Sequence, residues 1–115
     1  MIHPKVGQKT TARPIVSTNA GPILGRSEGQ TDVYRGVPYA RPPLGHLRWQ
    51  PPLPPVPWTA IRDAGSYGPA CIQVDPVTRR VFGSEDCLSL NIWRPCGENG
   101  LPVMVYLHGG NNVMG

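Results

Sequence analysis

Four residues near the carboxy-terminal end of the chain have the types and order needed to stabilise a developing negative charge. His108-Gly109-Gly110-Asn111 directly follow an apolar run over residues 103–107. A short run of β-branched and aromatic residues predicts a strand buried on both faces, and the glycines after it let the backbone turn and present its N–H groups. Such N–H groups can form an oxyanion hole, in which each donor contributes about 3 kcal/mol to transition-state stabilisation.

A serine motif occurs much earlier in the chain. Gly25-Arg26-Ser27-Glu28-Gly29 matches G-x-S-x-G, a pattern that marks a nucleophilic serine on a strained turn between a buried strand and a helix. Only two apolar residues precede the motif here, and no helical periodicity follows it. Because such a motif carries meaning only in its structural context, we expect that Ser27 is not a nucleophile.

His108 borders the candidate donors, and histidine is the side chain that most often acts as a general base, so it is a candidate for that role. In hydrolases with a nucleophile elbow, however, the base histidine comes last in the sequence. We therefore expect the His108 side chain to support the turn.

Short strands are predicted on both sides of a proline-rich stretch. Residues 15–18, 23–26 and 31–34 are separated by turn residues and predict a small antiparallel meander. From 36 to 58 prolines recur every few residues, which excludes a helix and a central strand and predicts extended coil. Apolar and polar residues alternate from 88 to 93, which predicts a further strand.

The ends of the chain differ in character. Residues 1–14 are polar and aperiodic and predict a flexible lead. Residues 15–115 are expected to form one portion of a domain, in which the run at 103–107 is the last strand. With 15 Pro and 14 Gly among 115 residues, much of this portion should be ordered coil.

Composition excludes several functional classes. The net charge of +4 is spread along the chain without a basic run, which argues against nucleic-acid binding. No stretch approaches the roughly 18 apolar residues of a membrane span, and residues 1–14 lack the apolar core of a secretory leader. From these patterns we expect a cytoplasmic protein with no membrane partner.

Three segments together resemble the N-terminal part of the type-B carboxylesterase and cholinesterase family of α/β-hydrolases. They occur in the family's order and approximate spacing, and the similarity extends over residues 15–115. The segments are YRGVPYARPPLGHLRW at 34–49, SEDCLSLNIW at 84–93, and the His-Gly-Gly sequence at 108–110.

The resemblance implies an α/β fold with a mixed, mostly parallel sheet covered by helices, to which this chain contributes mainly short strands and Pro/Gly-rich coil. It also implies serine-dependent hydrolysis of small carboxylic esters through an acyl-enzyme, without a cofactor. Gly110 and Asn111 would supply backbone oxyanion donors, with Asn111 standing where the family usually has Gly or Ala. The triad and a third donor would come from the remainder of the hydrolase domain, so we expect residues 1–115 alone to be inactive.

Two further pairs are implied by the resemblance. Cys71 and Cys87 match a family disulfide, whose closure of a 15-residue loop could contribute about 3 kcal/mol. A reducing compartment would instead keep these thiols free, together with Cys96. No C-x-x-C or paired-histidine pattern suggests zinc.

An ion pair between Arg48 and Glu85 is the second implied pair, and it would tie the proline-rich coil to the strand at 88–93. If the pair is partly buried, loss of one partner costs about 3 kcal/mol or more. An exposed pair contributes under about 1 kcal/mol.

Two other functions fit parts of the sequence. Arg48, Pro51 and Pro54 form R-x-x-P-x-x-P, a pattern typical of polyproline II ligands of peptide-binding domains. The family interpretation instead uses these prolines as rigid coil, with Trp49 and Trp58 packing inward. A noncatalytic adhesion or binding member of the same fold is the other alternative, and a residue other than Ser, Cys or Thr at the downstream elbow would indicate it.

Overall fold

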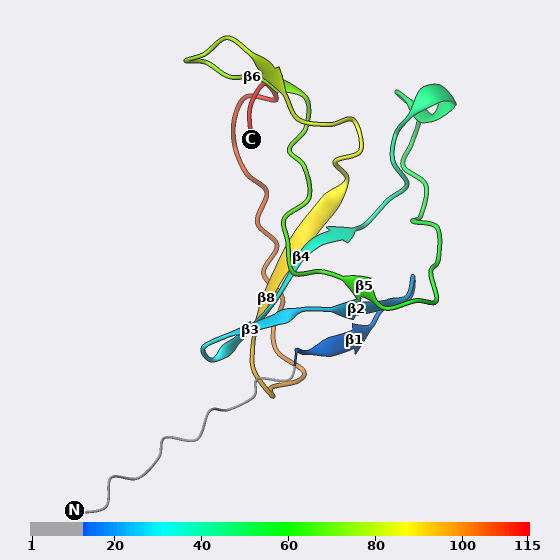
Figure 1. Ribbon diagram of the computed structural model, residues 1–115, viewed down its shortest axis with the longest axis vertical. Coiled ribbons are helices and arrows are strands. Elements are labelled where there is room, and N and C mark those ends of the chain that lie inside the picture. Colours follow the sequence, from blue (N-terminus) through cyan, green and yellow to red (C-terminus); the bar gives the residue numbers. More distant parts are fainter. Residues whose placement is uncertain (1–12) are drawn as a thin grey trace, which may run out of the picture.

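The computed structural model describes residues 13–115, which form two three-stranded sheets and one small hairpin (Figure 1). The first sheet has the order β1-β2-β5. β1 (Ile15–Ser17) and β2 (Pro22–Leu24) are antiparallel, and β5 (Arg62–Asp63) runs parallel to β2. The β1–β2 turn is closed by reciprocal backbone hydrogen bonds between Thr18 and Gly21, as the turn residues predicted.

The second sheet is antiparallel and has the order β3-β4-β8. It contains β3 (Arg26–Glu28), β4 (Thr31–Pro38) and β8 (Ser89–Pro95), so the strand predicted from the alternation at 88–93 is confirmed. The exclusion of a central strand from residue 36 onward was wrong, because β4 is central and continues to Pro38. A register shift between Tyr34 and Val37 diverts two amides to other acceptors, and proline then occupies the last strand position, where its missing N–H costs little.

A small core lies where β2, β4 and the residue after β5 meet. It consists of Ile23, Tyr34, Val37 and Ala64, and Val16 and Trp58 pack against it. The indole N–H of Trp58 donates to the carbonyl of Pro22 at 2.9 Å, so this tryptophan does pack inward.

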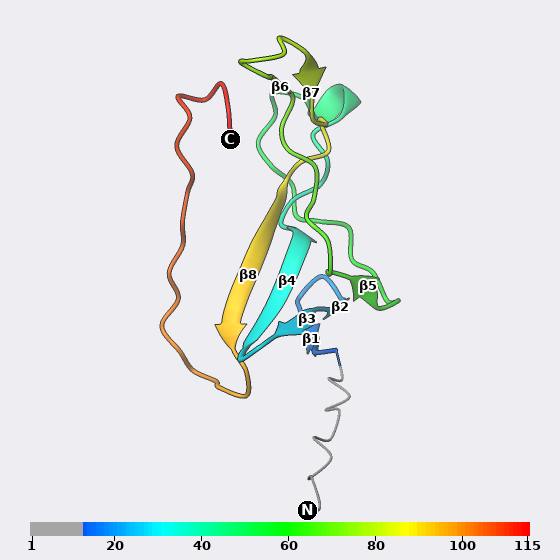
Figure 2. The same ribbon diagram turned by 60° about the vertical axis from the view of Figure 1, so that its left-hand side comes forward.

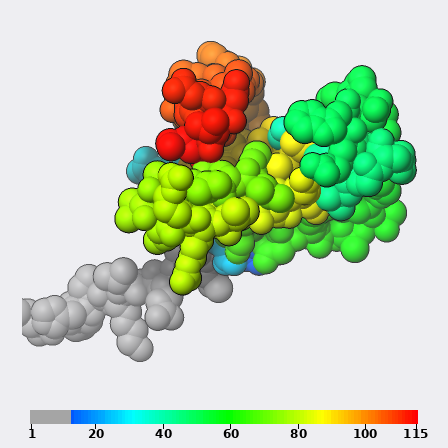
Figure 3. Space-filling view, turned by 90° about the horizontal axis from the view of Figure 1, so that it is seen from above, coloured from blue at the N-terminus to red at the C-terminus, as the bar shows by residue number. Residues whose placement is uncertain are grey.

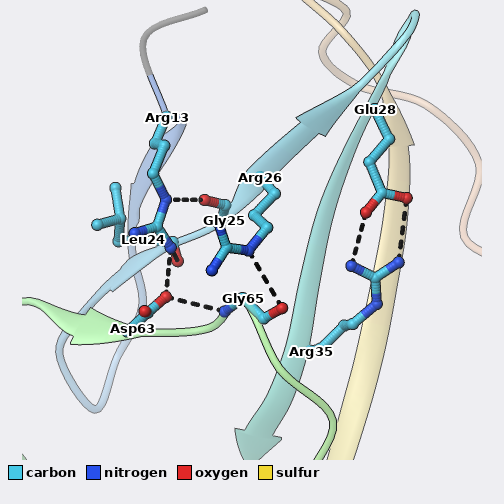
Figure 4. A network of polar contacts seen from close by, with 8 residues as sticks. All are labelled: Arg13, Leu24, Gly25, Arg26, Glu28, Arg35, Asp63 and Gly65. Atoms are coloured by element: carbon cyan, nitrogen blue, oxygen red, sulfur yellow. Dashed lines mark hydrogen bonds and ion pairs between the residues drawn. The ribbon is translucent and has the colours of Figure 1, made fainter.

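Arg13 ties the start of the described chain to the first sheet (Figure 4). Its guanidinium donates to the carbonyls of Leu24 and Gly25 and pairs with Asp63, which in turn accepts from the amide of Gly65. The carbonyl of Pro14 also accepts from the amide of Gly25, and residues 1–12 of the predicted lead lie outside the described residues.

The proline-rich segment forms an arm that doubles back on itself. The amide of Arg41 donates to the carbonyl of Leu53, and the arm holds one 3-10 turn, Gly45–Leu47. Trp49 follows this turn with φ 60° and is 94% exposed, so the prediction that it packs inward was wrong. Trp49 lines a shallow hollow with Pro43, Arg48 and Glu85, and it lies outside the core cluster. No helix in the described residues is long and apolar enough to cross a membrane.

The segment after β8 is extended but unpaired. The strand predicted at 103–107 is not formed, and its five side chains are between 78% and 92% exposed. Figure 2 shows this segment bowed away from β8. A strand requires a hydrogen-bonded neighbour, and none of the strands within residues 13–115 lies beside this run.

A separate hairpin lies between β5 and β8 in the sequence. β6 (Gln73–Val74) and β7 (Val81–Phe82) pair antiparallel, and an isolated parallel bridge joins Cys71 and Ser84 next to the hairpin. Asp75 caps the connecting turn by accepting from the amides of Val77 and Thr78. Figure 1 shows the carboxy-terminal residues returning to this hairpin.

Candidate active site

Residues 108–115, which we call the glycine loop, form a compact turn. The amides of Val113 and Met114 both donate to the carbonyl of Gly110, at 3.0 and 3.2 Å. Gly110 has φ 125°, and a Cβ there would overlap the carbonyl oxygen of Met114. Asn111 has φ 53°, a left-handed conformation that asparagine adopts more readily than most residues. Glycine is therefore required at 110, while asparagine is tolerated at 111.

The two amides predicted as oxyanion donors are unpaired in the described part of the chain. Within residues 13–115, neither Gly110 nor Asn111 donates its backbone N–H to a hydrogen bond. An oxyanion hole needs donors that are fixed in place and not already paired. Within residues 13–115 the two amides meet the second condition, since neither is paired.

The ends of the glycine loop meet each other and the hairpin. The ring of His108 lies so close to Gly115 that a Cβ at 115 would overlap it, and its Nδ1 is 2.8 Å from the carbonyl oxygen of Gly109. These contacts give His108 the supporting role predicted for it. Gly115 also hydrogen-bonds with the side chain of Gln73, and Figure 3 shows the last residues beside the hairpin. Sequence analysis missed Gln73, because its partner is 42 positions away and no local pattern marks the pair.

The G-x-S-x-G sequence has a structural explanation at each defining position. It spans a strand and a hairpin turn, with Gly29 at φ 64° between β3 and β4, and no helix follows. Gly25 lies against the ring of Tyr34, which a Cβ would approach to 2.7 Å. The hydroxyl of Ser27 donates to Asp32 at 2.9 Å. The prediction that Ser27 is not on a nucleophile elbow is confirmed.

Asp32 is a buried carboxylate, 5% exposed, that accepts hydrogen bonds from three side chains. Besides Ser27, the thiol of Cys96 donates at 3.2 Å and the guanidinium of Arg94 at 3.3 Å. Burial by itself raises the pKa of Asp32, but the hydrogen bonds from Cys96, Ser27 and Arg94 outweigh it and hold the pKa below its usual value. The same contact with Asp32 raises the pKa of the Cys96 thiol.

The structure brings Arg48 and Glu85 together. Nε of Arg48 lies 3.1 Å from Oε2 of Glu85, and the two side chains are 53% and 36% exposed. An ion pair with this exposure contributes under about 1 kcal/mol, so it orients the arm more than it stabilises the fold. Its presence also means that the basic residue of the R-x-x-P-x-x-P pattern already has an acidic partner.

The three cysteines are free thiols, and the disulfide implied between Cys71 and Cys87 is not formed in the structure. The two thiols nevertheless interact. Burial, a hydrogen bond with Cys71 and the neighbouring carboxylates of Asp86 and Glu85 together raise the pKa of Cys87 to about 11. Within the described residues no group of three His, Cys, Asp or Glu side chains could hold a metal ion.

Comparison with solved structures shows that the chain has the fold of the N-terminal part of an α/β-hydrolase. The chain superposes on a solved structure of PNB esterase with a TM-score of 0.81 and 39% identity, over 90% of this chain and 21% of that one. A thermophilic PNB esterase gives a TM-score of 0.82 and 38% identity, over 90% and 23% of the two chains.

The sequence comparisons assign the family. The model of the carboxylesterase family matches residues 12–115, so the chain belongs to this family. It is 45% identical to phenmedipham hydrolase of Pseudarthrobacter oxydans, over 90% of this chain and 23% of the relative. It is 43% identical to carboxylesterase 1E of Mus musculus, over 89% and 22%. The chain thus spans between a fifth and a quarter of these relatives' length.

Proposed function

We propose that the intact protein carrying this chain hydrolyses carboxylic esters through a serine acyl-enzyme, and that this chain supplies the oxyanion donors. The observation that carries the proposal is the glycine loop of a carboxylesterase-family chain, in which no group of residues 13–115 accepts from the Gly110 or Asn111 amide. The alternatives of a proline-rich ligand and a noncatalytic binding protein gain no specific support from the geometry.

The chemistry follows from where charge develops. A serine of the remaining domain attacks the ester carbonyl, and its proton passes to a histidine base. The carbonyl oxygen becomes negatively charged and accepts from Gly110 and Asn111, each N–H lowering the barrier by about 3 kcal/mol. Collapse of the tetrahedral intermediate breaks the bond to the alcohol oxygen, and the histidine gives its proton to the departing alcohol. Water, deprotonated by the same histidine, then attacks the acyl-enzyme, and the acid and the free serine are released.

The remainder of the hydrolase domain is the partner that this chain requires. The apolar run at 103–107 is almost fully exposed, and Leu90, Ile92 and Trp93 of β8 are 39%, 39% and 54% exposed. Exposed apolar surface of this extent is typical of a face that another part of a domain covers. We expect the isolated 115-residue chain to aggregate or to lack a cooperative melting transition.

The substrate is proposed only as a class, a small carboxylic ester. The relatives' names refer to different esters, among them phenmedipham and, for an esterase of Sphingopyxis macrogoltabida, fumonisin B1. Asn111 adds a polar side chain beside the proposed oxyanion site, where the acyl group would lie. We therefore propose that Asn111 contributes to acyl preference.

The test is hydrolysis of a nitrophenyl ester by the intact protein. We expect turnover that is abolished when the downstream elbow serine is changed to Ala, and no turnover by residues 1–115 alone. A hydrolytically inactive intact protein with a residue other than Ser, Cys or Thr at the elbow would support the noncatalytic alternative. Activity of the isolated chain that is lost with Ser27→Ala would contradict the proposed site.

We also propose a cytoplasmic location, where Cys71, Cys87 and Cys96 are thiols as in the structure. Alkylation of the denatured protein without reductant, after purification from its native compartment, tests this proposal. Three labelled cysteines support it, whereas labelling of Cys96 alone indicates the disulfide implied by the resemblance and an oxidising compartment.

A further inference from the structure

We propose that Gln73 is a positioning residue for the oxyanion donors, because its side-chain amide fastens the glycine loop to the β6–β7 hairpin. The catalytic consequence rests on the proposed esterase function, while the mechanical role can be tested without it. Gln73 contacts neither Gly110 nor Asn111 and acts on them through Gly115.

Two hydrogen bonds form the contact between Gln73 and Gly115. Nε2 of Gln73 donates to the carbonyl of Gly115 at 3.0 Å, and the amide of Gly115 donates to Oε1 of Gln73 at 3.3 Å. The side-chain amide thus pairs with both backbone groups of one residue, as a neighbouring strand does. Glutamate at this position could accept but not donate, and alanine could do neither.

Gln73 is itself held in place. Its Nε2 also donates to the carbonyl of Cys71 at 3.2 Å, and its backbone pairs with Phe82 in the hairpin. The amide of Ser84 donates to the carbonyl of Ala70 at 2.9 Å and closes the hairpin base. Gln73 therefore lies on a hydrogen-bonded hairpin. Residues 103–107, which lead to the glycine loop, pair with no strand among residues 13–115.

The anchored end controls the donors because the loop is closed. Gly115 packs against the ring of His108 at the opposite end of the loop. The carbonyl of Gly110 accepts hydrogen bonds from the amides of Val113 and Met114, which form the turn. Within residues 13–115, the hydrogen bonds that connect the glycine loop to the rest of the chain are those with Gln73. Among the described residues, Gln73 is therefore what holds the end of the glycine loop that lies opposite the apolar run.

The direct test is hydrogen exchange of the intact protein, measured on peptides covering residues 108–115. We expect Gln73→Ala to accelerate exchange in these peptides, Gln73→Glu to accelerate it less, and Gln30→Ala to leave it unchanged. Gln30 is a matched control because it is an exposed glutamine in the β3–β4 turn, far along the chain from the loop. Equal exchange in Gln73→Ala and Gln30→Ala would overturn the proposal, whether or not the protein hydrolyses esters.

The kinetic test separates positioning from general destabilisation. Displaced donors should lower kcat for a nitrophenyl ester by about 10²-fold with a small change in KM, since a misplacement near 1 Å can have this effect. Affinity for a trifluoromethyl ketone, which forms an oxyanion-like adduct, should fall in parallel. An unchanged kcat and inhibitor affinity in Gln73→Ala would refute the positioning role. A wild-type protein without esterase activity would refute the proposed function instead, and the exchange result would still decide the anchor.

Discussion

Ser27 and Asp32 face each other across the β3–β4 pair, and the hydroxyl of Ser27 donates to the carboxylate of Asp32 at 2.9 Å. This bond uses the serine of the G-x-S-x-G sequence to satisfy a buried charge. Cys96 and Arg94 donate to the same carboxylate from the end of β8 and just beyond it. The cluster therefore joins the beginning of β4 to the end of β8, and its function is structural.

Replacement of Ser27 by Ala should leave ester hydrolysis intact and lower stability. Asp32 loses one of its donors, which costs about 1–2 kcal/mol for a buried charged acceptor. Urea unfolding of the intact protein measures this loss, and Ser17→Ala on exposed β1 is the control. A large drop in kcat with unchanged stability would show that the interpretation of Ser27 is wrong.

The stability contributed by Asp32 should depend on pH. Because its pKa is held below the usual value in the folded state, the carboxylate stabilises the fold above the unfolded pKa of about 4, and this contribution is lost as pH falls through the folded pKa. We expect the difference in urea midpoint between wild type and Asp32→Asn to be largest at neutral pH and to shrink below about pH 4. A difference that grows on acidification would contradict this assignment.

Gly25 should not tolerate a side chain. An alanine Cβ would lie 2.7 Å from two ring carbons of Tyr34, so the ring must move within the core, at a cost of about 1–3 kcal/mol. Gly109→Ala serves as the stability control because a Cβ there meets open space. Thermal melting of the intact variants compares the two, and equal midpoints would exclude the packing argument.

The Arg48–Glu85 pair should contribute little to stability. We expect Arg48→Ala, Glu85→Ala and the double variant each to shift the free energy of unfolding by under about 1 kcal/mol, since both side chains are more than a third exposed to water. The double-mutant cycle isolates the pair, and its coupling energy should fall further in high salt. A coupling energy near 3 kcal/mol would indicate that other parts of the domain bury the pair.

Gly110 should be the most sensitive position of the glycine loop. A Cβ there overlaps the Met114 carbonyl, and φ 125° is unfavourable for alanine, so Gly110→Ala should displace both donors. We expect kcat of the intact protein to fall by about 10²-fold or more, with a much smaller change in KM. Retention of wild-type kcat would remove Gly110 from the oxyanion site.

The sequence predicted the parts of the fold that depend on local chemistry. The turn at residues 18–21, the β8 alternation and the absence of an α-helix from the proline-rich arm all follow from backbone restrictions that act within a few residues. The sequence-based prediction failed where pairing with another strand decides the structure. The apolar run at 103–107 has strand composition, but without a paired strand it stays extended and exposed.

By itself, the sequence determined the family, through three motifs in order, and located the glycines that can present oxyanion donors. Only the tertiary structure decided that Trp49 is exposed, that β4 continues through Gly36 to Pro38, and that Gln73 holds Gly115. The physical reason is the sequence separation over which the interactions act. Turn conformation and periodicity are set by adjacent residues, whereas burial and side-chain pairing depend on groups brought together from distant parts of the chain.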